Sequence, residues 1–162
     1  MTGMTEPDRC LAVLRLRGNV NIARELEYVF TLLHLPRKNH ATLMENSPSK
    51  LGMLRKIKDY ATWGEVSPLV ITQLLHQRGR LTGDQPVTDD VVEARLGYAS
   101  IADLSTALHD LQADLWRLPG LKPVFRLHPP TGGFRGSITK PYPKGELGYR
   151  GEAINDLLVK MM

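Results

Sequence analysis

The stretch Ser47-Pro-Ser-Lys-Leu-Gly-Met-Leu-Arg-Lys-Ile-Lys-Asp-Tyr60 places a helix at a definite point in the chain, and the rest of the fold can be built outward from it. A Ser-Pro pair is a strong helix start, because serine caps the first free amides and proline fits the first helical position. The apolar residues that follow recur at helical spacing. Beyond the helix, Thr62, Trp63 and Val66 favour extended backbone and predict a short strand over residues 61–66.

A strand, a helix and a second strand are predicted upstream of this stretch. Side chains alternate in character from Leu11 to Arg17, and that period of two is typical of a strand with one face in a core. Asn19 or Asn21 is placed to cap the next helix, whose apolar residues recur at helical spacing. Residues 41–45 then predict the second strand. In the first strand one face carries Ala12, Leu14 and Leu16, and the other carries Val13, Arg15 and Arg17.

Downstream, Ser67-Pro68 repeats the helix-start signal. The next region, residues 81–116, predicts two short capped helices, and residues 124–128 predict a last strand. The stretch 129–151 contains four prolines and six glycines, which predicts an extended arm with little core of its own. An amphipathic helix is predicted over residues 152–162.

The net charge of +4 is the sum of segments that differ strongly from one another. Residues 9–80 hold 12 basic and 5 acidic residues, and residues 117–162 hold 8 basic and 3 acidic ones. Between them, residues 81–116 hold one basic and 7 acidic residues. This partition indicates a polyanionic partner for the two basic blocks, and a solvent-facing or protein-facing role for the acidic block.

No catalytic or metal-binding set of residues is recognisable. The five histidines lack metal-ligand spacing, Cys10 is the single cysteine, and the acidic pair Asp89-Asp90 is better explained as the start of a helix. We therefore expect a protein that is not an enzyme and that needs no cofactor or metal. The absence of a signal-peptide pattern, of a long apolar run and of a disulfide framework leads us to expect a cytoplasmic protein.

The strands contribute basic residues to a possible binding surface. Arg15 and Arg17 share a face of the first predicted strand, and Arg126 and His128 share a face of the last one. If these two strands paired, the four side chains would form a basic patch opposite the core.

The Gly/Pro arm makes RNA the favoured polyanion. A basic segment without a core gains order chiefly by lying on a polyanion. Phe134, Tyr142 and Tyr149 alternate along the arm with its lysines and arginines, and their rings can stack on nucleotides. The complete set of predicted RNA-binding residues is Arg15, Arg17, Arg37, Lys38, His40, Lys50, Lys56, Lys58, Arg78, Arg80, Arg126, Arg135, Lys140, Lys144 and Arg150.

Several segments resemble one known family. Leu11-Ala-Val-Leu-Arg-Leu-Arg-Gly18, the stretch from Ser47 to Tyr60 and Thr62-Trp-Gly-Glu65 look like large-subunit ribosomal protein thirty. The long archaeal form fits best, and it is also similar to eukaryotic large-subunit protein seven. The resemblance covers nearly all of the sequence after residue 9. Residues 11–66 resemble the short bacterial core, and Gly132-Gly-Phe-Arg-Gly136 resembles part of the glycine-rich ending of the long form.

The resemblance implies an α+β fold with a ferredoxin-like core, in which helices pack on one face of an antiparallel sheet, plus a helical insertion and an extended C-terminal arm. It divides the chain into an N-terminal stub (1–10), an rRNA-binding core (11–80), an acidic helical insertion (81–118) and a last region (119–162). It also implies a structural role in the large ribosomal subunit, supporting translation and subunit assembly. The implied partners are 23S-type rRNA, the 5S rRNA neighbourhood and adjacent ribosomal proteins.

Two other functions stay open on the residues alone. The acidic helical block would suit a protein-interaction adaptor. A small-ligand or enzyme module is the second alternative, because the ferredoxin-like fold hosts many functions.

Overall fold

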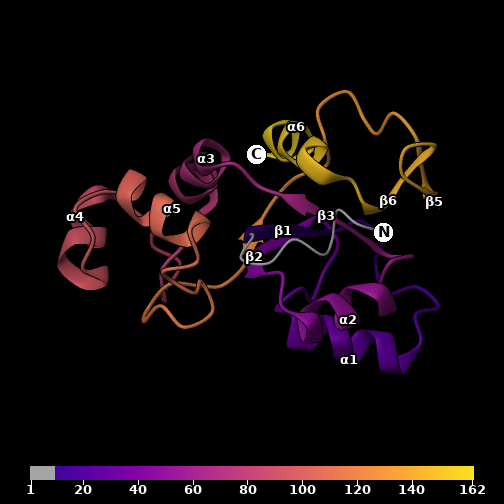
Figure 1. Cartoon of the computed structure of the whole chain (residues 1–162), viewed down its shortest axis with the longest axis horizontal. Coiled ribbons are helices and arrows are strands. Elements are labelled where there is room, and N and C mark those ends of the chain that lie inside the picture. The colour runs from indigo at the N-terminus through magenta and orange to yellow at the C-terminus, as the bar shows by residue number, and fades with distance from the viewer. Residues whose placement is uncertain (1–9) are drawn as a thin grey trace.

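A six-stranded mixed sheet forms the middle layer of the protein, and helices cover both of its faces (Figure 1). The computed structural model describes residues 10–162, so the expected N-terminal stub lies outside the described residues except for Cys10. The strand order is β4-β2-β1-β3-β6-β5. The strands are β1 (Cys10–Arg15), β2 (His40–Glu45), β3 (Ala61–Glu65), β4 (Phe125–Arg126), β5 (Ser137–Pro141) and β6 (Gly145–Tyr149).

The four strands β4, β2, β1 and β3 form an antiparallel unit, and the two C-terminal strands extend it in parallel. β1 lies between β2 and β3, with Leu14 opposite Ala41 on one side and Thr62 on the other. β4 pairs with β2, so the pairing between the first and last predicted strands does not form. The prediction of a basic patch across those two strands is therefore wrong.

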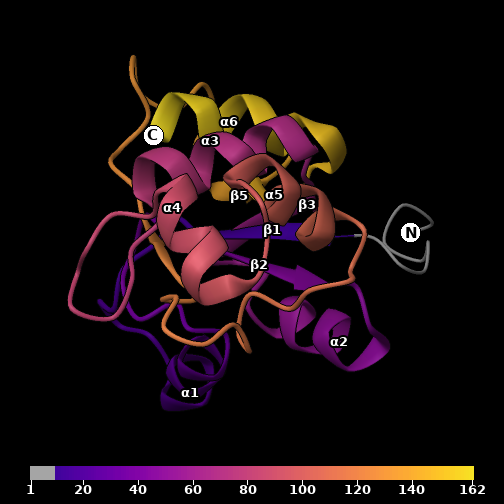
Figure 2. The same ribbon diagram turned by 90° about the vertical axis from the view of Figure 1, so that its left-hand side faces the viewer.

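The helices form two layers. α1 and α2 cover one face of the sheet, whereas α3 and α6 lie on the other, as both views show, and α5 packs beside α3 (Figures 1 and 2). The predicted packing of the core helices on one face describes α1 and α2 but is wrong for α3, which also falls within the predicted core (11–80). The helical segments are α1 (Arg24–Leu32), α2 (Pro48–Lys56), α3 (Pro68–Arg78), α4 (Asp89–Val91), the π-helical turn η2 (Val92–Leu96), α5 (Ile101–His109), the 3₁₀ turn η3 (Gly151–Ala153) and α6 (Ile154–Met161).

Serine caps start the helices as the sequence predicts. The hydroxyl of Ser47 accepts a hydrogen bond from the Lys50 amide, and that of Ser67 accepts one from the Val70 amide. The predicted asparagine cap of α1 is wrong. That helix begins after Ala23 without a side-chain cap, and the Asn19 side chain accepts a hydrogen bond from Arg15 instead.

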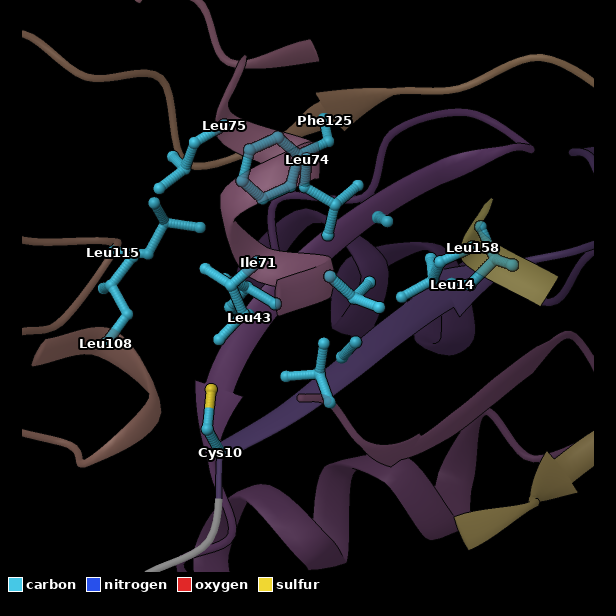
Figure 3. Packing of buried hydrophobic residues seen from close by; sticks show 14 of the residues in the cluster. Cys10, Leu14, Leu43, Ile71, Leu74, Leu75, Leu108, Leu115, Phe125 and Leu158 are labelled. Atoms are coloured by element: carbon cyan, nitrogen blue, oxygen red, sulfur yellow. The ribbon is translucent and has the colours of Figure 1, made fainter. Parts of the chain in front are cut away.

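The alternating side chains of β1 contribute to two hydrophobic clusters, one on each face of the sheet, rather than to one. Leu11 and Val13 belong to the cluster beneath α1 and α2. Ala12 and Leu14 belong to the cluster on the opposite face, where Leu14 lies among side chains from α3 and α6 (Figure 3). Because both faces are covered, all six residues of β1 are buried, including Arg15.

The second half of the Gly/Pro arm is part of the folded body. β6 pairs with β3, with Gly148 opposite Thr62, and Gly145, Glu146 and Leu147 are buried. Thr62 donates its hydroxyl hydrogen to the Gly148 carbonyl at 2.7 Å. The expectation of an arm with little core therefore fits β5, which is exposed throughout, and is wrong for β6.

Candidate nucleic-acid interface

Basic residues gather at one end of the sheet. β1 ends at Arg15 and β2 begins at His40, and these positions share an end because the two strands are antiparallel. Arg126 of β4 lies directly opposite His40. The loop before β2 adds Arg37 and Lys38. We refer to Arg17, Arg37, Lys38, His40 and Arg126 as the basic corner.

Backbone hydrogen bonds hold the loop of the basic corner against the sheet. The Asn39 amide donates to the Arg15 carbonyl at 2.7 Å, and the Asn39 carbonyl accepts from the Leu127 amide at 3.0 Å. Asn39 adopts a φ of 65°, a conformation that asparagine tolerates better than most residues. Lys38 passes close to Gly18, where an added Cβ would lie 4.0 Å from its Cδ. The loop is thus fixed at both sides, so its cations have a defined place.

Arg15 supports the basic corner from inside. Its side chain is 1% exposed and stacks on the Phe30 ring, with Cζ 4.0 Å from the ring centroid. Nη1 donates to the Leu35 carbonyl at 2.8 Å, and Nε donates to the Arg17 carbonyl at 2.9 Å. Burial lowers the pKa of this guanidinium from its usual value. Arg15 therefore adds positive potential to the corner, but its side chain is not available to a partner in solution.

The pKa of His40 is lowered by its position in the basic corner. Burial is the largest cause that lowers its pKa, and the charges of Arg126, Arg37 and Arg15 lower it further. Its Nδ1 is buried and has no hydrogen-bond partner among the described residues. Burial first, and then the charges of the neighbouring guanidiniums, therefore favour the neutral form of this imidazole.

The cations of the basic corner differ in whether they already contact an acidic or aromatic side chain of the protein. Arg37 and Lys38 are exposed, and neither forms an ion pair with another residue of the described range 10–162. Arg126 lies 3.5 Å from Asp84. Arg17 is half-buried, with its guanidinium 4.7 Å from the Tyr60 ring centroid. Arg37 and Lys38 are therefore the cations of the corner that are most available for phosphate.

The predicted lysines near α2 lie in three different environments. Lys50 is largely buried between Glu45, at 3.4 Å, and the Trp116 ring, whose centroid is 4.6 Å from Nζ. Trp116 also donates its Nε1 hydrogen to Thr42 of β2. Lys50, which lies over the same ring, therefore helps to hold Trp116 and the later part of the chain against the core. Lys56 lies 3.9 Å from Glu25, and Lys58 is exposed. Lys58 is the most accessible of the three.

The remaining predicted residues divide between folding contacts and exposed positions. Arg78 donates two hydrogen bonds to the Met162 carbonyl, and Arg80 donates to the Gly79 carbonyl. Arg150 is buried, with its Nε hydrogen bonded to Thr62 at 2.8 Å and its Nη2 3.7 Å from Glu146. Burial lowers the pKa of Arg150, and Glu146 partly offsets that effect. The exposed residues of the arm are Arg135, Lys140 and Lys144.

The opposite end of the sheet is acidic. Glu45 ends β2 opposite Cys10, and Glu65 ends β3 beside Leu11. Glu65 also lines an open cavity of about 520 Å³ together with Asp110 and Glu152. Sequence reasoning missed this end, because Glu45 and Glu65 come from a segment that is basic in total. β2 and β3 both pair antiparallel with β1, so Glu45 and Glu65 lie at the same end of the sheet, and recognising this pairing would have predicted it.

No group of three or more His, Cys, Asp or Glu side chains in residues 10–162 is arranged to hold a metal ion. No helix in the same part of the chain is long and apolar enough to cross a membrane.

The fold and the charge distribution define a class: a small α+β protein with the electrostatic footprint of a nucleic-acid-binding protein at one end of its sheet. The model of the ribosomal protein L30p/L7e family matches residues 11–61. The chain is 50% identical to large ribosomal subunit protein uL30 of Methanopyrus kandleri, over 91% of this chain and 100% of that protein. It is 43% identical to the uL30 proteins of Archaeoglobus fulgidus (93% of this chain, 98% of that one) and Hyperthermus butylicus (93% and 89%).

The chain belongs to the ribosomal protein L30p/L7e family. The resemblance that the sequence suggested is thereby confirmed.

Proposed function

We propose that this protein is a structural component of the large ribosomal subunit and that it binds rRNA through the basic corner. Its role is structural rather than enzymatic, as family membership supports. The observation that carries the binding site is the fixed loop bearing Arg37 and Lys38, two exposed cations next to His40. The partners that fit are large-subunit rRNA, including the 5S region, and neighbouring ribosomal proteins.

The unit from β1 to β3 is proposed to be the ferredoxin-like core of the family, since its two helices pack on one face of antiparallel strands. The proposed core region, residues 11–80, adds α3 on the opposite face to this unit, and is followed by the acidic insertion 81–118 and the region 119–162. The relatives cover more than 90% of the chain, which supports treating all three parts as features of the long family form.

Within the proposed interface the predicted residues take two roles. Arg15 and Arg150 support the interface from the interior, because their donors are already used by the fold. The proposed phosphate contacts come from exposed cations, which recognise the shape and backbone of folded RNA more than its base sequence. These residues are Arg37, Lys38, Lys58, Arg126, Arg135, Lys140 and Lys144.

The test is the salt dependence of rRNA binding by the full chain. The double variant Arg37→Gln/Lys38→Gln removes the two freest cations of the corner. Each phosphate contact contributes about 0.7 (single strands) to 0.9 (B-DNA) to the slope of log K against log salt, so the loss of two contacts should reduce the slope by roughly 1.5 to 2. Affinity at low salt should fall as well.

A matched control is Arg95→Gln/Arg117→Gln, which changes the net charge equally but acts on or beside the acidic block. Arg117 already lies 3.6 Å from Asp114. The control should leave the slope near that of the wild type. If both double variants changed affinity and slope by the same amount, binding would follow net charge alone and the basic corner would lose its role.

A further inference from the structure

A second concave surface lies on the C-terminal side of the molecule. A cavity of about 640 Å³ is lined by residues of α6 and of the segment 133–150. Both of these segments lie at the upper right of Figure 1. The walls of the cavity include Arg135, Tyr142, Lys144, Arg150, Leu157 and Lys160. The volume falls within the range of sites that hold small organic groups.

Both walls of this cavity are fastened to the folded body. On one side the Thr131 amide donates to the Lys160 carbonyl at 3.0 Å, and the His128 amide donates to the Met161 carbonyl at 3.0 Å. On the other side Arg150 is fixed by Thr62 at 2.8 Å. The loop between these anchors therefore stands away from α6 over a defined gap.

Tyr142 is the aromatic side chain that the cavity offers to a ligand. Of the three aromatic residues of the arm, Phe134 packs against the hydrophobic cluster and Tyr149 donates its hydroxyl hydrogen to Glu65. Tyr142 is 40% exposed, and the Arg150 guanidinium lies 5.2 Å from its ring centroid. A planar base can stack on such a ring, with the guanidinium adding to the attraction.

Basic residues outnumber acidic ones in the lining of the cavity, whose carboxylates are Glu146 and the exposed Asp156. Arg135, Lys144 and Lys160 are exposed, and within residues 10–162 none of them forms an ion pair. Glu146, which also lines the cavity, is occupied by Arg150 at 3.7 Å. The cavity thus combines one exposed aromatic face with several free cations, which is the chemistry that recognises a nucleotide with its phosphate.

We propose that this cavity binds one unpaired nucleotide of RNA, with its base stacked on Tyr142 and its phosphates among Arg135, Lys144 and Lys160. The inference rests on the proposed function, because it gives the phosphate-binding cations Arg135 and Lys144 of the arm an unpaired nucleotide of the same rRNA, in addition to the folded RNA that the basic corner binds. A base paired inside a helix has no free face, so a duplex cannot use this cavity.

The experiment compares the binding of two RNA probes by the full chain. One probe is a single-stranded octaribonucleotide, and the other is a blunt duplex of the same sequence. Tyr142→Ala should weaken binding of the single strand by roughly 5- to 150-fold, the range measured for loss of one stacked base. Tyr142→Phe should stay within about twofold of the wild type, because the stacking face is kept. Tyr28→Ala, at an exposed tyrosine of α1, is the matched control and should leave binding unchanged.

The outcomes separate this inference from the proposed function. If Tyr142→Ala bound the single strand as tightly as the wild type, or lost affinity equally for the duplex, the nucleotide cavity would be wrong. The salt-dependent binding of rRNA through Arg37 and Lys38 would stand in that case. A wild-type chain that bound no RNA probe and no rRNA would overturn both.

Discussion

Arg15 provides the sharpest test of how this fold is held together. Its guanidinium is buried, and its hydrogen-bond acceptors are the carbonyls of Leu35 and Arg17 and the side chain of Asn19 rather than a carboxylate. Two substitutions separate the charge from the hydrogen bonds. Arg15→Met removes both, whereas Arg15→Lys keeps the charge on an ammonium that cannot span the three acceptors.

The expected fall in the free energy of unfolding for Arg15→Met follows from the loss of two contacts. The Leu35 carbonyl becomes a buried acceptor without a partner, which costs about 1–3 kcal/mol. Stacking of the cation on Phe30 is worth about 2 kcal/mol when desolvated, and a methionine sulfur restores about 1 kcal/mol of it. Removal of the buried charge offsets part of the remainder, so the free energy of unfolding should fall by roughly 2 kcal/mol.

Arg15→Lys should be the less stable of the two variants, by roughly 1 kcal/mol or more, because a buried charge with fewer partners costs more than no charge. Urea unfolding followed by tryptophan fluorescence and far-ultraviolet circular dichroism measures both values, provided that the m-value is unchanged. Arg17→Met is the control, since Arg17 is only half-buried and should lose less than about 1 kcal/mol. The reasoning is refuted if the lysine variant is as stable as the wild type or more stable than the methionine variant.

Two further predictions concern Gly64 and His40. Gly64→Ala should destabilise the protein by about 3 kcal/mol or more, because the new Cβ would overlap the backbone carbonyl of Gly151. Gly52→Ala, in α2 with no neighbour within 4 Å, should instead be neutral or stabilising in the same urea assay, and equal losses would contradict the overlap argument. The folded-state pKa of His40 lies below its ordinary 6.5, so its contribution to stability is present above pH 6.5 and is lost as the pH falls toward the folded value. His40→Gln should therefore flatten the decline of unfolding free energy between about pH 7 and 5, and parallel profiles for the two proteins would count against this assignment.

Local signals in the sequence predicted much of the fold. Both Ser-Pro pairs start helices, and the hydroxyls of Ser47 and Ser67 make the expected capping hydrogen bonds. The alternation in β1 also has the predicted parity, because Val13 and Arg15 share the face that packs on α1. These features depend on residues a few positions apart, and chain propensity and capping decide them without reference to the rest of the molecule.

The errors arose where distant segments meet. Arg15 was expected to face a partner, because a strand with alternating character usually has one wet face. Here the face that carries Arg15 is covered by α1 and α2, with the guanidinium stacked on Phe30, while α3 and α6 cover the face of Ala12 and Leu14. β6 was missed for a related reason. A stretch rich in glycine and proline carries little strand signal, and Gly148 joins the sheet because Thr62 and β3 offer it hydrogen bonds.

In the candidate site, too, residues that are close in sequence could be predicted, whereas those brought together by the fold could not. Arg37 and Lys38 are adjacent in sequence and could be predicted from composition, whereas the contribution of Arg126 depends on the register between β2 and β4. The role of Tyr142 as the exposed aromatic of the arm depends on which aromatic rings the fold buries.

The arrangement of charge in space has a consequence for orientation that the counts along the chain do not contain. The antiparallel strands bring Arg126 and the loop of Lys38 to one end of the sheet, and Glu45 and Glu65 to the other. β6 runs parallel to β3, so Lys144, which precedes β6, lies toward the basic end as well. A molecule with opposite charges at its two ends has one favoured direction of approach to a polyanion, since the acidic end is repelled where the basic end is attracted. The same strand register that builds the core therefore also determines which end of this protein faces RNA.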